Sequence, residues 1–230
     1  MIEFLFLDLD DTILDFHKAE RLALGKTFRA FHLEPTEAVM ARYSQINKIY
    51  WERLERKELT REEVLVGRFA ELFREFGLQV NAGRCARFYE DNLSVGHYFL
   101  DGAPEALESL SRKYKLYLAS NGTAKVQAGR LASAKISHYF QEIFVSQEMG
   151  ANKPDRLYFE RCFARIPNFD LSKAMMVGDS LTSDILGGKN AGMATCWVNP
   201  QEKPCRPEIC PDYEIAALHQ LEALLETINV

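Results

Sequence analysis

Carboxylates gather directly after the first apolar run of the chain. Residues 2–7 are apolar except for Glu3, and Asp8, Asp10 and Asp11 follow within four positions. Two like charges about 4 Å apart repel by roughly 4 kcal/mol at an effective dielectric near 20, so the group is costly by itself. A divalent cation removes that repulsion, and hard oxygen ligands suit Mg²⁺. We expect Asp8 and Asp10 to bind Mg²⁺ and Asp11 to turn the chain.

Three later apolar runs end in polar residues of the same kind. They end in Ser120-Asn121-Gly122, in the segment that leads to Lys153, and in Asp179 with Asp184 five residues on. Ligands of an open parallel sheet bind beyond the carboxyl ends of its strands, so we expect these groups to meet at one edge. Two further aspartates then join the metal site; as an alternative, Asp184 binds backbone amides of the turn that it belongs to. The lysine, the serine hydroxyl and the backbone N–H groups of residues 121 and 122 are expected to hold phosphate oxygens.

Strand-like segments must position these residues. Short apolar runs rich in β-formers lie at residues 2–8, 115–122, 142–147, 173–180 and 193–199, and a short edge strand with a closing helix is expected after residue 211. Runs that are apolar on both faces are typical of a parallel sheet covered by helices on both sides. The sequence therefore predicts an α/β fold with a doubly wound, Rossmann-like parallel sheet.

A helical block interrupts this alternation between the first strand and the rest. Apolar residues recur at the helical period in three stripes: Leu24, Phe28 and Phe31; Tyr43, Ile46, Tyr50 and Leu54; Leu65, Phe69, Leu72 and Phe76. Thr60 and Glu63 have the spacing of a capping box that opens the third helix. We predict an α/β core formed by residues 1–15 and 94–230, with residues 16–93 inserted as a helical cap.

Composition narrows the class of protein. The 230 residues are 47% hydrophobic and 27% charged with a net charge of −5, which favours neither a nucleic-acid polymer nor a membrane surface as partner. The N-terminal run does not resemble a signal peptide, because Glu3 and Asp8 interrupt it. Five scattered cysteines are typical of reduced thiols, so a cytoplasmic protein is expected. The sequence favours neither a monomer nor a homodimer.

The four polar segments resemble the motifs of the haloacid dehalogenase-like (HAD) phosphohydrolases. The first family motif, DxDxT, matches "DLDDT", and motif two resembles Ser120 in "LASNGT". Motif three resembles Lys153 in "NKPD", and the fourth motif, GDxxxxD, matches "GDSLTSD". All four occur in order, and the resemblance spans essentially the whole chain. It implies a phosphomonoesterase of small phosphorylated metabolites.

The resemblance also implies a role for each motif residue. Asp8 would attack phosphorus and form an aspartyl-phosphate, while Asp10 would protonate the leaving alcohol and then deprotonate the hydrolytic water. Mg²⁺ would bind Asp8, the backbone carbonyl of Asp10, Asp179 and, directly or through water, Asp184. Ser120 and Lys153 would stabilise the phosphoryl oxygens.

The place of the insertion resembles the C1-type cap of the family, a lid that contacts the leaving group. The segments "INKIYWERLERKELTREEVLVGRFAELFREFG" and "IFVSQEMGANKPD" are most similar to the pyrimidine 5′-nucleotidase branch, which implies nucleoside 5′-monophosphates as substrates. Candidate nucleoside contacts are Phe16, His17, Asn47, Trp51 and Arg68. As alternatives, the tryptophan is a cap-core residue and the arginine an ion-paired helix residue.

Other functions remain open on the same residues. A phosphatase or phosphomutase for sugar phosphates or phosphoglycolate would use the same site. A 2-haloacid dehalogenase would need neither the metal site nor an acid at position 10, so Asp10 argues against it. A non-catalytic binding protein would be expected to lack one of the motif residues, and all are present.

Overall fold

The computed structural model describes residues 1–229 and divides the chain into two compact units. One, the core unit, comprises Met1–Phe16 with His97–Val230, and the other, the helical unit, comprises His17–Gly96. Val230, which the predicted core range includes, lies outside the described residues. No helix within residues 1–229 combines the length and the apolar character needed to cross a membrane.

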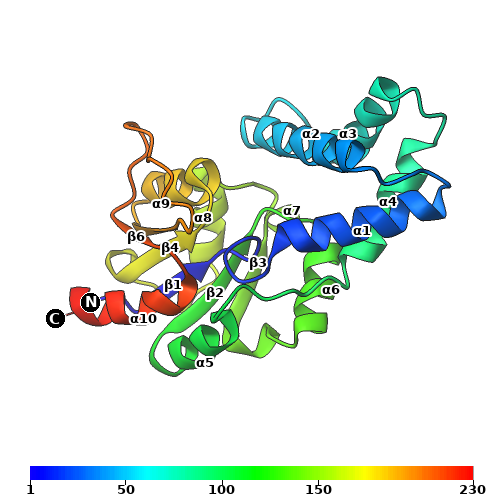
Figure 1. Cartoon of the computed structure of the whole chain (residues 1–230). Coiled ribbons are helices and arrows are strands. Elements are labelled where there is room, and N and C mark those ends of the chain that lie inside the picture. Colours follow the sequence, from blue (N-terminus) through cyan, green and yellow to red (C-terminus); the bar gives the residue numbers. More distant parts are fainter. Residues whose placement is uncertain (230) are drawn as a thin grey trace. The chain divides into compact units, whose positions relative to one another are not determined.

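A parallel sheet forms the centre of the core unit (Figure 1). Its strands lie in the order β3-β2-β1-β4-β5-β6. Every neighbouring pair is parallel. The strands are β1 (Phe4–Leu7), β2 (Lys115–Ser120), β3 (Phe140–Val145), β4 (Ala174–Gly178), β5 (Ala194–Val198) and β6 (Tyr213–Ile215). The predicted doubly wound parallel sheet is confirmed.

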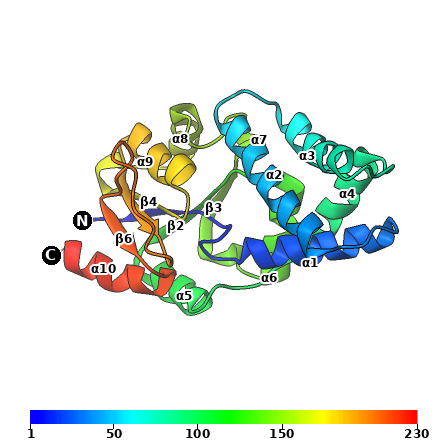
Figure 2. The ribbon, with the colours of Figure 1, turned by 45° about the horizontal axis from the view of Figure 1, so that its top comes forward.

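Both faces of the sheet are buried, which explains why its strands are continuously apolar. On β1, Leu5 and Leu7 belong to one core cluster while Phe4 and Phe6 belong to another, because successive side chains point to opposite faces. The first cluster includes residues of α5 (Ala103–Lys113), α6 (Ala124–Ala134) and α10 (Leu221–Ile228). The second includes residues of α7 (Ser146–Met149), α8 (Arg156–Phe163) and α9 (Leu186–Ala191). Figure 2 shows α5 and α10 on the side of the sheet opposite α8 and α9.

Three strands end two residues earlier than predicted: β2 at Ser120, β4 at Gly178 and β3 at Val145. The sequence suggested a strand over residues 142–147, whereas β3 ends at Val145 and residues 146–149 form the short helix α7. Gly150 follows in a left-handed conformation (φ 66°), which an ordinary residue rarely adopts. The chain therefore turns early after β3 and leads back toward Lys153.

The helical unit contains α2 (Glu37–Glu55), α3 (Arg61–Glu75), α4 (Ala82–Leu93) and most of α1 (Phe16–Ala30). The predicted capping box at the start of α3 is confirmed, since Thr60 and Glu63 exchange both hydrogen bonds. Three buried rings, those of Tyr43, Phe69 and Tyr89, form the centre of the unit with centroid separations of 4.8–5.7 Å. Rings in this arrangement contribute both apolar burial and favourable ring contacts.

Candidate functional site

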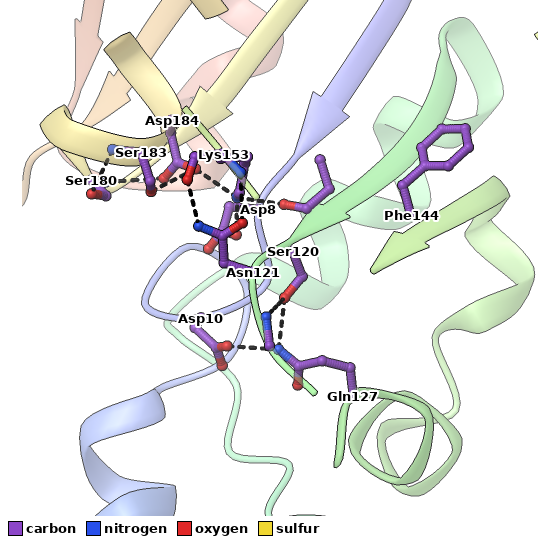
Figure 3. Close-up of polar contacts among 12 residues, drawn as sticks. Asp8, Asp10, Ser120, Asn121, Gln127, Phe144, Lys153, Ser180, Ser183 and Asp184 are labelled. Carbon is purple, nitrogen blue, oxygen red and sulfur yellow. Dashed lines mark hydrogen bonds and ion pairs between the residues drawn. The ribbon is translucent and has the colours of Figure 1, made fainter. Parts of the chain in front are cut away.

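Polar side chains from the carboxyl ends of three strands lie together in the core unit (Figure 3). Asp8 follows β1, Ser120 ends β2, and Asp179 follows β4. Lys153 comes from the loop after α7, and its backbone is held by the side chain of Asn121. That amide accepts from Lys153 N at 2.8 Å and donates to Lys153 O at 2.9 Å. The loop that carries the lysine is therefore tied to the end of β2.

Lys153 is the centre of a buried ionic cluster. Its Nζ donates to Asp8 Oδ1 at 2.6 Å, to Asp184 Oδ1 at 2.7 Å and to the carbonyl oxygen of Ala119 at 2.5 Å. The side chain is only 1% exposed. Burial alone lowers the pKa of a lysine, but the carboxylates of Asp184 and Asp8 raise the pKa of Lys153 above its ordinary value. The ammonium is thus held charged in the protein interior.

Three carboxylates face this single ammonium. Oxygen atoms of Asp8, Asp179 and Asp184 all lie within 4.8 Å of one another. Burial raises the pKa of Asp8, Lys153 lowers it, and the charges of Asp184 and Asp10 raise it, so that the pKa reaches about 8. Burial and the charges of Asp184, Asp8 and Asp11 hold the pKa of Asp179 well above its ordinary range. With all three ionised, the cluster carries three negative charges and one positive charge.

This donor set fits a divalent cation such as Mg²⁺. Its atoms are hard carboxylate oxygens from three residues, which leaves room for water and phosphate in an octahedral shell. Two positive charges would offset the two uncompensated negative charges. They would also remove the repulsion that raises the pKa of Asp8.

Asp184 reaches the cluster because the chain leaves β4 in an unusual way. Its Oδ2 accepts from Ser180 N at 3.0 Å at the start of the π-helical turn η3 (Leu181–Ile185). A Cβ on Gly178 would lie 2.2 Å from the same Oδ2, so only glycine permits this placement. Asp184 therefore binds a backbone amide, one of its two predicted roles, while its other oxygen points to Lys153. Its direct or water-mediated contact with metal stays a prediction.

Asp10 belongs to a second group of residues. Gln127 Nε2 donates to Asp10 Oδ2 and to Ser120 Oγ at 2.8 Å each. Arg130 makes an ion pair with Asp10 Oδ1. Ser120 Oγ also accepts from Gly122 N at 3.1 Å. Asp8 and Asp10 thus lie two positions apart in sequence but have different partners.

Gln127 and Arg130 were missed by the sequence analysis. Both lie on α6, in the segment "AKVQAGRLASA", and are 1% and 0% exposed. Helical period alone gave no reason to single them out. The available signal was two long polar side chains three residues apart in a helix that is otherwise mostly small or apolar.

Asp11 has the structural role that was predicted for it. Its Oδ1 accepts from Phe16 N at 2.9 Å, and its backbone is left-handed with φ 55°. Asparagine and aspartate tolerate this conformation better than most residues. Phe16 itself lies in the core unit, where its ring is 5.8 Å from the Arg130 guanidinium carbon.

The remaining candidate substrate residues lie in the helical unit. Asn47 and Arg68 are 6% and 3% exposed, and Arg68 donates to Asn47 Oδ1 at 2.6 Å. Asn47 in turn donates to Glu20 Oε1 at 2.9 Å. Trp51 is half-buried with the Arg61 guanidinium carbon 5.5 Å from its ring, and His17 is exposed. Their contact with a substrate stays a prediction.

Comparison with known proteins places these observations in a family. Residues 5–198 match the model of the family described as haloacid dehalogenase-like hydrolase. The HAD-hydrolase YfnB of Bacillus subtilis is 40% identical over 98% of this chain and 96% of its own length. A crystal structure of YfnB described as bound to magnesium superposes with a TM-score of 0.92, covering 100% of this chain and 99% of that one at 39% identity.

Two relatives carry names that state an activity. The pyrimidine 5′-nucleotidase PynA of Streptococcus pneumoniae is 37% identical over 95% of this chain and 93% of its own length. The pyrimidine 5′-nucleotidase YjjG of Escherichia coli is 30% identical over 97% of both chains. From the family match, the strand-end motifs and the parallel sheet that positions them, we conclude that this chain belongs to the haloacid dehalogenase-like hydrolases.

Proposed function

We propose that this protein is a Mg²⁺-dependent phosphomonoesterase that releases phosphate from nucleoside 5′-monophosphates through an aspartyl-phosphate on Asp8. The observation that carries the proposal is the buried cluster in which Asp8 contacts Lys153 beside two further carboxylates. The nucleotide assignment is supported by the names of PynA and YjjG.

In the first step, a carboxylate oxygen of Asp8 attacks phosphorus and the bond from phosphorus to the leaving oxygen breaks. Asp10 gives its proton to that oxygen, so the nucleoside leaves as an alcohol. Lys153 and Ser120, together with the N–H groups of residues 121 and 122, would stabilise the charge on the phosphoryl oxygens.

In the second step, Asp10 takes a proton from water, and the water oxygen attacks phosphorus. The bond from phosphorus to Asp8 breaks, which restores the carboxylate and yields inorganic phosphate. Asp8, the carbonyl of Asp10, Asp179 and Asp184 would hold Mg²⁺, which supplies positive charge against the carboxylates and the phosphoryl group when bound. The helical unit would serve as the cap, with Phe16, His17, Asn47, Trp51 and Arg68 as candidate nucleoside contacts.

The test is phosphate release from pyrimidine and purine nucleoside monophosphates, sugar phosphates and phosphoglycolate, with Mg²⁺ and with EDTA. We expect Mg²⁺-dependent release led by uridine or thymidine monophosphate and abolished in Asp8→Asn. Asp11→Asn is the matched control, because asparagine keeps the acceptor for Phe16 N and tolerates the left-handed backbone. Release led by a sugar phosphate would overturn the nucleotide assignment, and no release at all would overturn the activity.

A further inference from the structure

Two long polar side chains of α6 contact the carboxylate of Asp10, one at each oxygen (Figure 3 shows Gln127). Gln127 and Arg130 are three residues apart and therefore lie on one helix face. We propose that both are positioning residues, which orient Asp10 for proton transfer to the leaving group. This inference rests on the proposed function.

Burial fixes the two donors much more firmly than the carboxylate that they contact. Gln127 and Arg130 are 1% and 0% exposed, whereas the side chain of Asp10 is 29% exposed. Gln127 also lies tightly against Gly122, where an added Cβ would be 2.4 Å from Nε2. Its amide is thus held by Ser120 Oγ on one side and by packing on another, so it can act as a rigid reference for Asp10.

Orientation matters because proton transfer depends on geometry. A misplacement of about 1 Å at a reacting group can cost on the order of 100-fold in rate. Asp10 lies beyond the end of β1, and a partly exposed aspartate there would otherwise sample several rotamers. The two donors leave Asp10 able to react, because each carboxyl oxygen has a second lone pair.

The test compares two leaving groups. An aryl oxyanion such as p-nitrophenolate departs without a proton, whereas the alkoxide of uridine 5′-monophosphate needs one. For Arg130→Lys, we expect kcat/KM to fall about 100-fold with the nucleotide and less than about threefold with p-nitrophenyl phosphate. Gln127→Leu also removes a donor to Ser120 Oγ, so both substrates should be slowed, but the nucleotide much more. Asp10→Asn should show the same selectivity, at least as strongly. Ala128→Ser, an exposed position of α6, is the matched control.

Comparing the two substrates tests the positioning role separately from the proposed phosphatase activity. Ser120→Ala should slow both substrates alike, because a contact with the phosphoryl group is independent of the leaving group. Equal losses with both substrates in Gln127→Leu and Arg130→Lys, or no loss, would overturn the positioning role while Asp8-dependent phosphate release still stands. A wild-type protein without such release would overturn the proposed function, and this inference with it.

A separate observation concerns the loop between β5 and β6. Cys205 Sγ and Cys210 Sγ lie 3.1 Å apart, and both residues are exposed. Arg206 and Ile209 between them form an antiparallel bridge, with Ile209 N donating to Arg206 O at 2.8 Å. Ile209 is 7% exposed and belongs to a small core cluster with Trp197. The anchored loop therefore holds the two thiols together.

We infer that Cys205 and Cys210 form a thiol–disulfide site whose oxidant is a low-molecular-weight disulfide. One cysteine, as thiolate, attacks a sulfur of the small disulfide, whose S–S bond breaks and releases one small thiolate. The second cysteine, as thiolate, attacks the protein sulfur of the mixed disulfide and displaces the other small thiolate. Two electrons pass to the small disulfide, and the two cysteine protons end on the released thiols.

The other cysteines provide an internal contrast. Burial raises the pKa of Cys85, of Cys162 and of Cys196 to about 12, so these thiols stay protonated and shielded at neutral pH. At the exposed pair, the hydrogen bond to Cys210 raises the pKa of Cys205, so exchange is expected to be faster at alkaline pH.

The experiment treats the reduced full chain with glutathione disulfide and maps its peptides by mass spectrometry without reduction. We expect a disulfide between residues 205 and 210, with the three buried cysteines unchanged. Cys205→Ser and Cys210→Ser should each keep a stable mixed disulfide with glutathione, since the second cysteine is missing. A wild-type chain that keeps both thiols free, or that carries glutathione on both, would overturn this inference.

Discussion

Each unit of the molecule contains a buried polar cluster, and the two differ in their balance of charge. In the helical unit, Glu20 and Arg68 lie at the two ends of Asn47, so one negative charge matches one positive charge. In the core unit, three carboxylates share the single ammonium of Lys153. The first cluster is complete by itself, whereas the second has two negative charges in excess when fully ionised.

We expect this difference in charge balance to separate a cluster that stabilises its unit from one that binds a ligand. A buried charge is tolerated when it is paired and hydrogen-bonded, and the helical unit meets this condition with its own residues. The core unit meets it only by binding protons or a cation. Burial, together with the neighbouring carboxylates, accordingly raises the pKa of Asp8 to about 8 despite the nearby Lys153. A buried cluster with unbalanced charge is therefore the better candidate for a ligand site.

Removing the ammonium of the core cluster should have the largest effect. We expect Lys153→Met to lower kcat on the order of 1,000-fold, about 4 kcal/mol, because the phosphoryl oxygens lose a buried positive partner. Lys173→Met is the matched control, since this lysine pairs with Glu3 and is 39% exposed. The measurement is kcat with Mg²⁺ at saturating nucleotide. Retention of more than about a tenth of the wild-type kcat would contradict the role of Lys153.

Breaking the helical cluster should affect stability more than turnover. Arg68→Met removes the positive charge and leaves Glu20 uncompensated, so we expect a loss of about 3 kcal/mol in the free energy of unfolding of the helical unit. Urea unfolding followed by a probe within that unit measures this loss. For the protein that remains folded, kcat/KM should stay within about threefold of wild type if Arg68 is purely structural.

The same variant tests the predicted substrate role of Arg68. A rise in KM without a change in stability would mean that this side chain binds the nucleoside, and that the helical cluster is a ligand site as well. Glu20→Gln combined with Arg68→Met removes both charges and should recover part of the lost stability. Failure to recover any would contradict a charge pair as the reason for the loss.

The pH dependence of metal binding gives a smaller effect. The pKa of Asp8 is about 8 in the folded protein and 3.8 by reference, so the metal-free folded state keeps a proton that the unfolded chain releases. This contribution to stability is fully present below the reference pKa and is lost as pH rises through about 8. Mg²⁺ competes with that proton. We therefore expect saturating Mg²⁺ to stabilise the protein by about 2 kcal/mol at about pH 8 and by less at about pH 5.

Thermal unfolding with Mg²⁺ and with EDTA across this range measures the difference. Asp8→Asn removes one of two carboxyls with a raised pKa, the other being Asp179, and should reduce the pH dependence. A rise in Tm on adding Mg²⁺ that is equally large at both pH values would contradict the coupling between proton and cation.

The sequence predicted the parts of the site that depend on local pattern. Asp8, Ser120 and Asp179 each follow an apolar run, and the carboxyl ends of parallel strands meet at one edge of the sheet. The parallel sheet could be predicted from its apolar strands, and the capping box of α3 from the spacing of Thr60 and Glu63. The end of β3 could not, because α7 follows the strand directly, with no glycine or proline between Val145 and Ser146 to mark the boundary.

A local sequence pattern could not predict contacts between residues that lie far apart in the chain. Gln127 and Arg130 lie 117 and 120 positions after Asp10, and nothing in the helical period of α6 shows which partner they face. The backbone N–H of Asn121 was predicted to bind a phosphate oxygen. Its side chain also makes two hydrogen bonds to the backbone of Lys153, which the sequence did not indicate. Such roles depend on which loops meet, and only the folded chain shows that.

The smallest expected effect tests whether Mg²⁺ binding depends on the exact position of the Asp184 carboxylate. Gly178→Ala would put a Cβ 2.2 Å from Asp184 Oδ2, so the carboxylate must move while every charged group is kept. We expect Mg²⁺ affinity to fall about 10-fold, as is typical when a metal ligand loses its orientation. Calorimetric titration with Mg²⁺ measures this change. Gly77→Ala is not a suitable control, because that glycine has φ 65°, whereas Gly83→Ala on α4 meets only ordinary contacts. If Gly178→Ala binds Mg²⁺ as tightly as wild type, the negative charge of the cluster alone accounts for metal binding. If its affinity falls while that of Gly83→Ala is unchanged, metal binding also requires the carboxylate of Asp184 to keep its position.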